Sequence, residues 1–213
     1  MIKINNMKKY YKNKLVLDVP VLNINDATIN YFTGKNGSGK TTLMLIICGF
    51  IHQTEGVVMV EGHKNTSGFV RKNSYVALES GKGFYEYLTA MENIKYFLGI
   101  NQIKFKQSEE KFYHLSEEFS FSEHINKKIS ELSQGNRQKL SLIMSLLVNS
   151  KIIALDEPTN GLDNSSKQML LNKLEELKEK GTTVLITTHD LFLTNNSTST
   201  NYRLSEGQII SVN

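Results

Sequence analysis

Apolar and polar positions alternate along this 213-residue chain in short blocks that predict strands and helices in succession. Strands are predicted where apolar or β-prone runs are bounded by glycine or polar turns, at residues 1–6, 15–19, 27–33, 56–62, 74–78, 151–155, 182–188, 202–204 and 208–211. Helices are predicted at residues 40–51, 137–148 and 165–180, and helical spacing recurs within 89–121. The polar run 195–200 predicts a loop.

The run 151–155 is apolar from Ile152 to Leu155, which is typical of a strand buried on both faces of a parallel sheet, and 182–188 is expected to be a second buried strand. We therefore expect an α/β fold, with one domain over residues 1–213. Residues 1–78 and 151–213 are expected to form an α/β core that carries an N-terminal antiparallel β subdomain. Residues from about 84 to 150 are expected to form an inserted helical subdomain.

The composition is that of an ordinary soluble protein, with 39% hydrophobic and 22% charged residues and a formal net charge of +4. The mild basic bias is spread along the chain, so no nucleic-acid partner is expected. Cys48 is the only cysteine, which excludes an internal disulfide and fits a reducing cytoplasm. No signal peptide, membrane-spanning run or Cys/His metal spacing is recognised, so we expect the chain to stay in the cytoplasm.

Residues 34–41 match the phosphate-loop pattern G-x-x-x-x-G-K-[ST] at every fixed position, between a predicted strand and a predicted helix. Glycine backbone and the positive end of the helix favour a bound anion, so the loop predicts a nucleoside triphosphate site. Lys40 is expected to reach the β- and γ-phosphates, and the Thr41 hydroxyl to ligate magnesium. The predicted nucleotide contacts are Gly34, Lys35, Asn36, Gly37, Ser38, Gly39, Lys40, Thr41 and Thr42.

Asp156 and Glu157 follow the buried strand 151–155, where uncompensated carboxylates would be costly. Magnesium held with Thr41 would compensate Asp156, and Glu157 would be placed to polarise a water as a general base. Ser133 and Gly135 precede the helical run 137–148 and predict a second anion-binding helix start, although a simple N-cap serine has the same pattern. His189 ends the strand 182–188 and is either a γ-phosphate donor or a structural histidine.

In this order and spacing, the elements resemble an ATP-binding cassette (ABC) ATPase over essentially the whole chain. Residues 34–41 are similar to the Walker A motif, 132–136 to the family signature, 152–157 to Walker B and 160–163 to the D-loop, and His189 is similar to the switch histidine. The resemblance implies ATP as the nucleotide. It also implies that Tyr11, or alternatively Tyr10, stacks on adenine.

Two departures from the family pattern stand out. The signature usually reads Leu-Ser-Gly-Gly-Gln, whereas this chain has Gln134 and Asn136 in place of the first Gly and the Gln. Ser133 and Gly135 are kept. No glutamine occurs between residues 73 and 100, where the family has its Q-loop, and Glu79 is the nearest polar candidate for a magnesium ligand.

The resemblance implies two cassettes, as a homodimer or heterodimer, with ATP and Mg²⁺ between Walker A of one subunit and the signature of the other. Catalytic roles then fall to Glu157, His189 and Lys40, and Mg²⁺ ligation to Thr41, Asp156 and Glu79. Contacts to the partner's ATP fall to Ser133, Gly135 and Asp163.

The favoured function is the ATPase subunit of a membrane transporter, held at the inner face of the membrane by separate permease subunits. The alternatives are a soluble ABC ATPase in cofactor assembly or in nucleic-acid or ribosome-associated work, and a P-loop kinase, which the signature and D-loop disfavour. The glutamate at the Q-loop favours an exporter, and the absence of a regulatory domain after Asn213 disfavours one importer type. Cargo contacts belong to the permease, so the sequence does not define the cargo.

Overall fold

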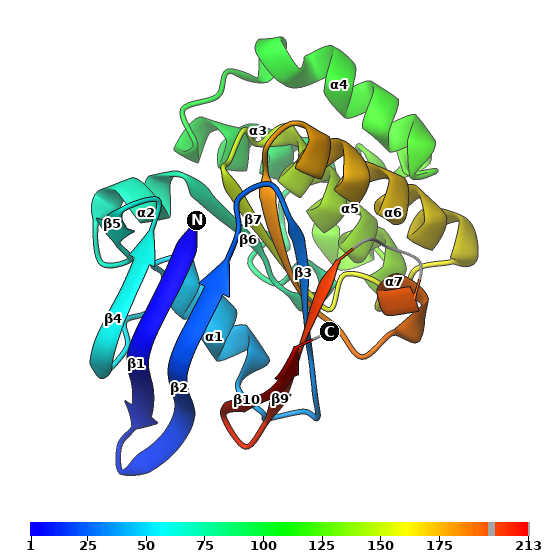
Figure 1. The fold of residues 1–213 in the computed structure, drawn as a ribbon. Helices are drawn as coiled ribbons and strands as arrows, with labels where there is room; N and C mark the ends of the chain where they lie inside the picture. Colours follow the sequence, from blue (N-terminus) through cyan, green and yellow to red (C-terminus); the bar gives the residue numbers. More distant parts are fainter. Residues whose placement is uncertain (196–198, 213) are drawn as a thin grey trace. The chain divides into compact units, whose positions relative to one another are not determined.

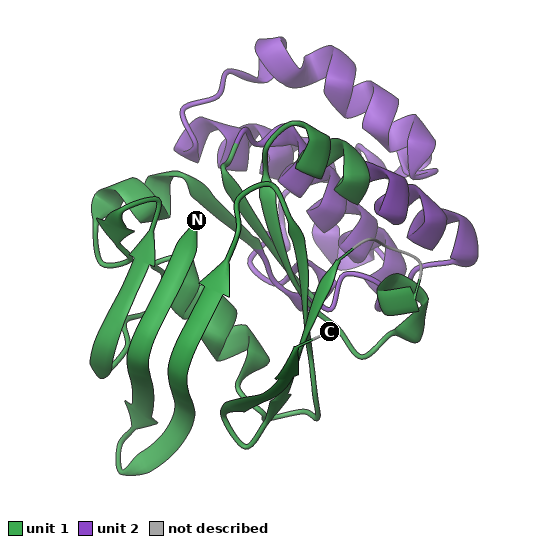
Figure 2. Ribbon diagram, viewed as in Figure 1, with its two compact units in different colours: residues 1–76, 150–156, 174–213 green, residues 77–149, 157–173 purple. Residues whose placement is uncertain are grey.

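The computed structural model describes residues 1–195 and 199–212 as two compact units (Figures 1 and 2). Unit 1 comprises residues 1–76, 150–156 and 174–213, and unit 2 comprises residues 77–149 and 157–173. The domain division expected from the sequence stays a prediction. Within the described ranges, no helix is both long enough and apolar enough to cross a membrane.

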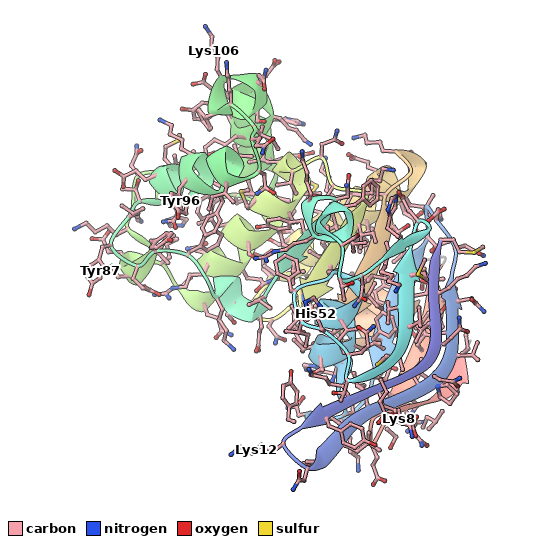
Figure 3. All side chains as sticks on the ribbon, turned by 90° about the vertical axis from the view of Figure 1, so that its left-hand side faces the viewer. Lys8, Lys12, His52, Tyr87, Tyr96 and Lys106 are labelled. Carbon is pink, nitrogen blue, oxygen red and sulfur yellow. The ribbon has the colours of Figure 1, made fainter. Side chains whose placement is uncertain are left out.

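The first sheet of unit 1 is antiparallel, with strand order β2-β1-β4-β5. Its strands are β1 (Ile2–Tyr11), β2 (Lys14–Ile24), β4 (Glu55–Val60) and β5 (His63–Lys64). Ile2 and Ile4 of β1 are buried while Lys3 between them is exposed, which is the alternation expected of a sheet with one face on the core. The long β1–β2 hairpin turns at Lys12, which is labelled in Figure 3.

The second sheet of unit 1 has strand order β10-β9-β3-β8-β7-β6. Its strands are β3 (Ile29–Thr33), β6 (Ser74–Ala77), β7 (Ile152–Asp156), β8 (Thr183–Thr187), β9 (Thr200–Ser205) and β10 (Gln208–Val212). β3 pairs in parallel with both β8 and β9, and β7 pairs in parallel with β8, whereas β9 and β10 form an antiparallel hairpin. Every residue of β8 is buried, as expected of a strand in the interior of the sheet.

The hydrophobic core of unit 1 joins both sheets through helix α1 (Lys40–Ile47). Leu43 and Ile47 of α1 pack in one cluster with Ile4 of the first sheet and with Ala154 and Leu185 of the second. Two shorter helices, α2 (Gly68–Lys72) and α7 (Leu191–Asn195), and the last part of α6 (Asn164–Glu179) also belong to this unit. The loop that leads into the first turn of α1 starts at the end of β3, which is paired on both sides by β8 and β9.

Unit 2 is helical, with α3 (Ala90–Ile100), α4 (Phe105–Glu118), α5 (Gln134–Leu147) and the first part of α6 (Asn164–Glu179) (Figure 2). Its buried apolar side chains include Ile94, Phe112, Phe119 and Leu140. A capping box starts α3, because the Thr89 hydroxyl accepts from the backbone N–H of Glu92 and the Glu92 carboxylate accepts from Thr89 N–H. Short 3-10 turns at Glu79–Gly81, Ser122–His124 and Ile129–Glu131 connect the helices.

The observed elements confirm the predicted α/β class and differ from the sequence expectations at the ends of elements. β1 extends to Tyr11 rather than residue 6, because ladder pairing with β2 continues through its polar residues. α1 ends at Ile47 rather than residue 51, and Gly49 beyond it has a φ of +74°. α2, β5 and α7 were not expected from the sequence, and the predicted loop 195–200 includes residues 196–198, which lie outside the described residues.

Candidate functional site

The phosphate loop of unit 1 connects the end of β3 to the start of α1, as predicted. Gly39 is the N-cap of α1 with a φ of +100°, a conformation that favours glycine. The ammonium of Lys40 folds back over the loop, where its Nζ donates to the carbonyl oxygens of Gly34 (2.8 Å) and Lys35 (3.2 Å). Lys40 is only 7% exposed, so its positive charge is held inside the loop.

Close packing explains why glycine is needed at two positions of this loop. A Cβ added to Gly34 would lie 2.2 Å from the carbonyl oxygen of Leu204, and the backbone φ of Gly34 is +146°. A Cβ added to Gly39 would lie 2.6 Å from Cδ2 of Leu17. The loop therefore cannot accept side chains at these positions without moving β2 or β9.

The residues of the loop fit a bound phosphate. The Ser38 hydroxyl is buried and has no hydrogen-bond partner among residues 1–195 and 199–212. A buried hydroxyl without a partner is costly, and a phosphate oxygen is the kind of partner that would satisfy it. The Lys40 ammonium and the N-terminus of α1 add positive charge at the same loop. The chemistry of this donor set is that of a polyphosphate site.

Asp156 lies at the carboxyl end of β7 and accepts hydrogen bonds from two threonines. Oγ1 of Thr41 donates to Asp156 Oδ1 over 2.9 Å, and Oγ1 of Thr187 donates to the same oxygen. Hydroxyl and carboxylate oxygens are the ligands that Mg²⁺ prefers, and this ion usually takes only one or two protein carboxylates. The side-chain oxygens of Thr41 and Asp156 are therefore close enough to bind one ion, as their predicted role as magnesium ligands requires.

Thr187 was not singled out from the sequence. It is fully buried, and in the parallel ladder its Cα partner on β7 is Asp156. Asp156 and Thr187 both lie at the carboxyl ends of buried strands, which is where functional side chains of a parallel sheet are found, and this position could have indicated Thr187. That signal needs the strand order and register, which the sequence pattern leaves open.

His189 follows β8 and lines a pocket of about 510 Å³ in unit 1. The pocket is also lined by Gly34 and Lys35 of the phosphate loop and by Arg203 of β9. His189 is exposed, so its imidazole is accessible at this pocket. Arg203 was missed by the sequence analysis, because no motif includes it and only the β3–β9 pairing brings it to the loop.

Tyr11 ends β1 and is 49% exposed, with Lys9 Nζ 4.9 Å from the centre of its ring. The neighbouring Tyr10 donates its backbone N–H to the Thr54 hydroxyl, and the β1–β2 register shifts between Lys9 and Tyr10. The exposed ring of Tyr11 is the kind of surface on which a base stacks. The assignment of Tyr11 rather than Tyr10 to adenine stays a prediction.

Unit 2 carries the other predicted site residues. Ser133 is the N-cap of α5, and its hydroxyl accepts from the backbone N–H of Asn136 over 3.3 Å. Gly135 lies in the first turn of α5, against Gly161: a Cβ added to Gly135 would be 2.4 Å from the Gly161 carbonyl oxygen. Glu157 begins the second segment of unit 2, with a φ of +46°, and its carbonyl accepts from the N–H of Asn160.

Asp163 caps the start of α6, where its carboxylate accepts from the Ser165 hydroxyl (2.7 Å) and the Ser166 N–H (2.8 Å). Lys139 of α5 lies 3.0 Å from the other carboxylate oxygen. The hydrogen bond from Ser165, followed by those from Ser166 and Lys139, holds the pKa of Asp163 well below its usual range. Asp163 is therefore a carboxylate at neutral pH.

The comparison with protein families decides the family of this chain. Residues 17–160 match the model of the ABC transporter family. The chain belongs to the ABC transporter family. It is one of that family's ATP-binding cassettes, and as such it is an ATPase, in agreement with the resemblance drawn from its motifs.

Relatives of the cassette carry the same description. An uncharacterized ABC transporter ATP-binding protein of Bacillus subtilis, YdbJ, is 33% identical over 191 residues, covering 89% of this chain and 61% of that protein. The lantibiotic transport ATP-binding protein SrtF of Streptococcus pyogenes is 31% identical over 194 residues, covering 90% of this chain and 81% of that protein. The chain thus spans about three fifths of the first relative's length.

Among solved structures, the dimeric structure of a bacterial ABC transporter cassette is 25% identical, with a TM-score of 0.88. That likeness covers 100% of this cassette and 98% of the other chain. The mixed fold with an antiparallel N-terminal sheet and a helical unit is therefore the fold of ABC cassettes.

Proposed function

We propose that this cassette is the ATP-binding and ATP-hydrolysing subunit of a membrane ABC transporter. The observation that carries the proposal is the phosphate loop of unit 1, where buried Lys40 lies over the loop and Thr41 contacts Asp156. Membership of the ABC transporter family supports the same conclusion.

The residues of unit 1 divide the binding work. Lys40 neutralises phosphate charge from inside the loop. Ser38 supplies a buried hydroxyl that forms a hydrogen bond with a phosphate oxygen. Thr41 and Asp156 hold Mg²⁺, which when bound draws charge away from the phosphates. Tyr11 stacks on the adenine, and the remaining contacts come from the backbone of residues 34–42.

Hydrolysis requires a base and a charge-stabilising donor beside the phosphates. Glu157 acts as the general base that orients the attacking water, and His189, exposed at the pocket of unit 1, donates to the γ-phosphate. Ser133, Gly135 and Asp163 contact the nucleotide held by a second cassette. Two cassettes, identical or different, therefore complete each other's sites.

The cassette docks on separate permease subunits at the cytoplasmic face of a membrane, and conformational change between its nucleotide states drives transport. The test is a pull-down of the tagged protein from detergent-solubilised native membranes, read by mass spectrometry. A stoichiometric polytopic membrane protein is expected. Recovery of soluble proteins or nucleic acid alone, while hydrolysis still depends on Glu157, would replace this function with that of a soluble ABC ATPase.

Transport runs outward in this proposal. Glu79 at the position of the Q-loop and the lantibiotic transport name of a relative support this direction. The test uses the purified complex in proteoliposomes with cassettes facing outward and a labelled lantibiotic in the medium. Accumulation of the peptide in the lumen after ATP addition is expected of an exporter, whereas release of preloaded peptide would show import.

A further inference from the structure

Three segments that are far apart in the sequence meet within unit 2. They are the 3-10 turn Glu79–Gly81, the first turns of α5 and the turn at residues 157–163 that precedes α6. Glu79 joins the first to the third: its Oε1 accepts a hydrogen bond of 2.9 Å from the side-chain amide of Asn160. Asn160 was not assigned any role from the sequence.

The turn Glu79–Gly81 is also fastened to α5. Ser80 has a φ of +56°, an uncommon conformation for a residue other than glycine. Its backbone N–H donates to Oε1 of Gln138 (2.7 Å), and its hydroxyl accepts from Nε2 of Gln134 (3.0 Å). Gln134 is one of the two residues that depart from the usual signature, and this bond accounts for a glutamine there. Glu79 is thus held on a turn with its own fixed support.

The turn 157–163 is held at two further points. Gly161 lies so close to Gly135 that a Cβ on Gly135 would not fit, and Lys139 forms an ion pair with Asp163 at 3.0 Å. Asn160 lies in the sequence between Glu157 and these two contacts. Its only described side-chain hydrogen bond is the one to Glu79. This hydrogen bond therefore adds a side-chain support to the first half of the turn, where Pro158 and Thr159 are buried and the Asn160 N–H donates to the Glu157 carbonyl oxygen.

We propose that Glu79 is a positioning residue for the turn 157–163, acting through Asn160, and that this is its role in place of magnesium ligation. The proposal rests on the proposed function, in which Glu157 orients the attacking water. The second carboxylate oxygen of Glu79 lies 3.4 Å from Lys82, a pair that is 37% and 68% exposed and so contributes little. The charge-assisted bond to Asn160 is the stronger contact.

A reversal of the pair tests the proposal. Glu79→Leu removes the acceptor, and Asn160→Asp sets two carboxylates against each other, so each is expected to lower kcat about tenfold while KM for ATP changes little. In the double variant Glu79→Gln, Asn160→Asp, the amide is on the other side and donates to the carboxylate, so most of the lost kcat returns. Lys82→Gln is the matched control and leaves kcat unchanged, because Lys82 is exposed.

Two further measurements separate the possible roles. The Mg²⁺ concentration for half-maximal activity is expected to be the same in all of these variants, and urea unfolding of the nucleotide-free protein should show favourable coupling between positions 79 and 160. A raised Mg²⁺ requirement in Glu79→Leu, without recovery of kcat in the double variant, would overturn the inference. Wild-type protein that fails to hydrolyse ATP would instead contradict the proposed function, and the unfolding cycle would still report on the contact.

Discussion

The hydroxyl of Thr41 donates a 2.9 Å hydrogen bond to the carboxylate of Asp156, and so joins the first turn of α1 to the end of β7 across 115 residues of sequence. Thr187 donates to the same oxygen from the adjacent strand. The partly buried carboxylate is thereby compensated by two hydroxyls. One of these hydroxyls is the predicted magnesium ligand.

Thr41 tests this geometry directly. Thr41→Ala removes the hydroxyl and leaves one acceptor site of Asp156 unpaired, so we expect a higher Mg²⁺ requirement and at least a tenfold lower kcat/KM. Thr41→Ser is the matched variant and should retain most activity, because it keeps the oxygen. Steady-state ATPase assays across a Mg²⁺ titration measure the Mg²⁺ requirement and kcat/KM of both variants. Equal values for Thr41→Ala and Thr41→Ser would contradict the role of the Thr41 hydroxyl as a magnesium ligand.

Glu157→Gln is expected to slow ATP hydrolysis by about a hundredfold or more, because an amide cannot accept the proton of the attacking water. ATP binding should persist, so a dimer loaded with ATP should accumulate and appear by size-exclusion chromatography. The control is Glu117→Gln on α4, an exposed position far from the predicted roles in sequence. Full hydrolysis by Glu157→Gln would remove this residue from the catalytic assignment.

Tyr11 and Tyr10 can be distinguished by truncation. Stacking on a base contributes about 1–3 kcal/mol, so Tyr11→Ala should raise the dissociation constant for ATP about tenfold, whereas Tyr11→Phe keeps the ring and most of the affinity. Tyr10→Ala is the matched control and is expected to change affinity little. Calorimetric titration with ATP measures all three, and a larger loss for Tyr10→Ala would transfer the role to Tyr10.

Gly135→Ala should destabilise the protein although alanine is the better helix former. The added Cβ would lie 2.4 Å from the Gly161 carbonyl oxygen, which is a backbone atom and cannot turn away as a flexible side chain could. Gly99 lies in α3 with nothing within 4 Å of an added Cβ, so Gly99→Ala should stabilise by about 0.5–1 kcal/mol. Urea unfolding compares the two, and changes of the same sign would contradict the packing argument.

His124 predicts a pH-dependent contribution to stability. Its Nε2 lies 3.0 Å from the Asn136 side-chain amide nitrogen, which donates to a neutral imidazole. Burial, with a smaller effect of Lys127, lowers the pKa of His124 below its usual value of 6.5. The unfolded chain therefore takes up the proton first as pH falls, so the contribution of neutral His124 is present above about pH 6.5 and is lost as pH drops through the folded pKa.

The stability advantage of wild type over His124→Gln is thus expected to shrink between about pH 7.5 and pH 5. Urea unfolding at several pH values measures it. A constant difference over this range would mean that the imidazole titrates alike in the folded and unfolded chain.

Much of the fold was predictable because the hydrophobic patterns of its longer elements are local and strong. The buried run at residues 182–188 became β8, and the leucine face of 165–180 became α6, within a residue or two at each end. α2 and α7 have five residues each, too short for a helical period to be recognised. The polar half of β1 was missed, because pairing with β2 rather than its own pattern makes it a strand.

The sequence by itself determined the phosphate loop and the family. Glycine spacing, Lys40 and Thr41 act through backbone conformation over a few residues, so their arrangement is local and readable in the chain. Only the tertiary structure decided the partners of the functional side chains: Thr187 for Asp156, Lys139 for Asp163 and Asn160 for Glu79. These pairs are separated by 24 to 81 residues, and their contact depends on strand register and helix packing, which no local pattern encodes.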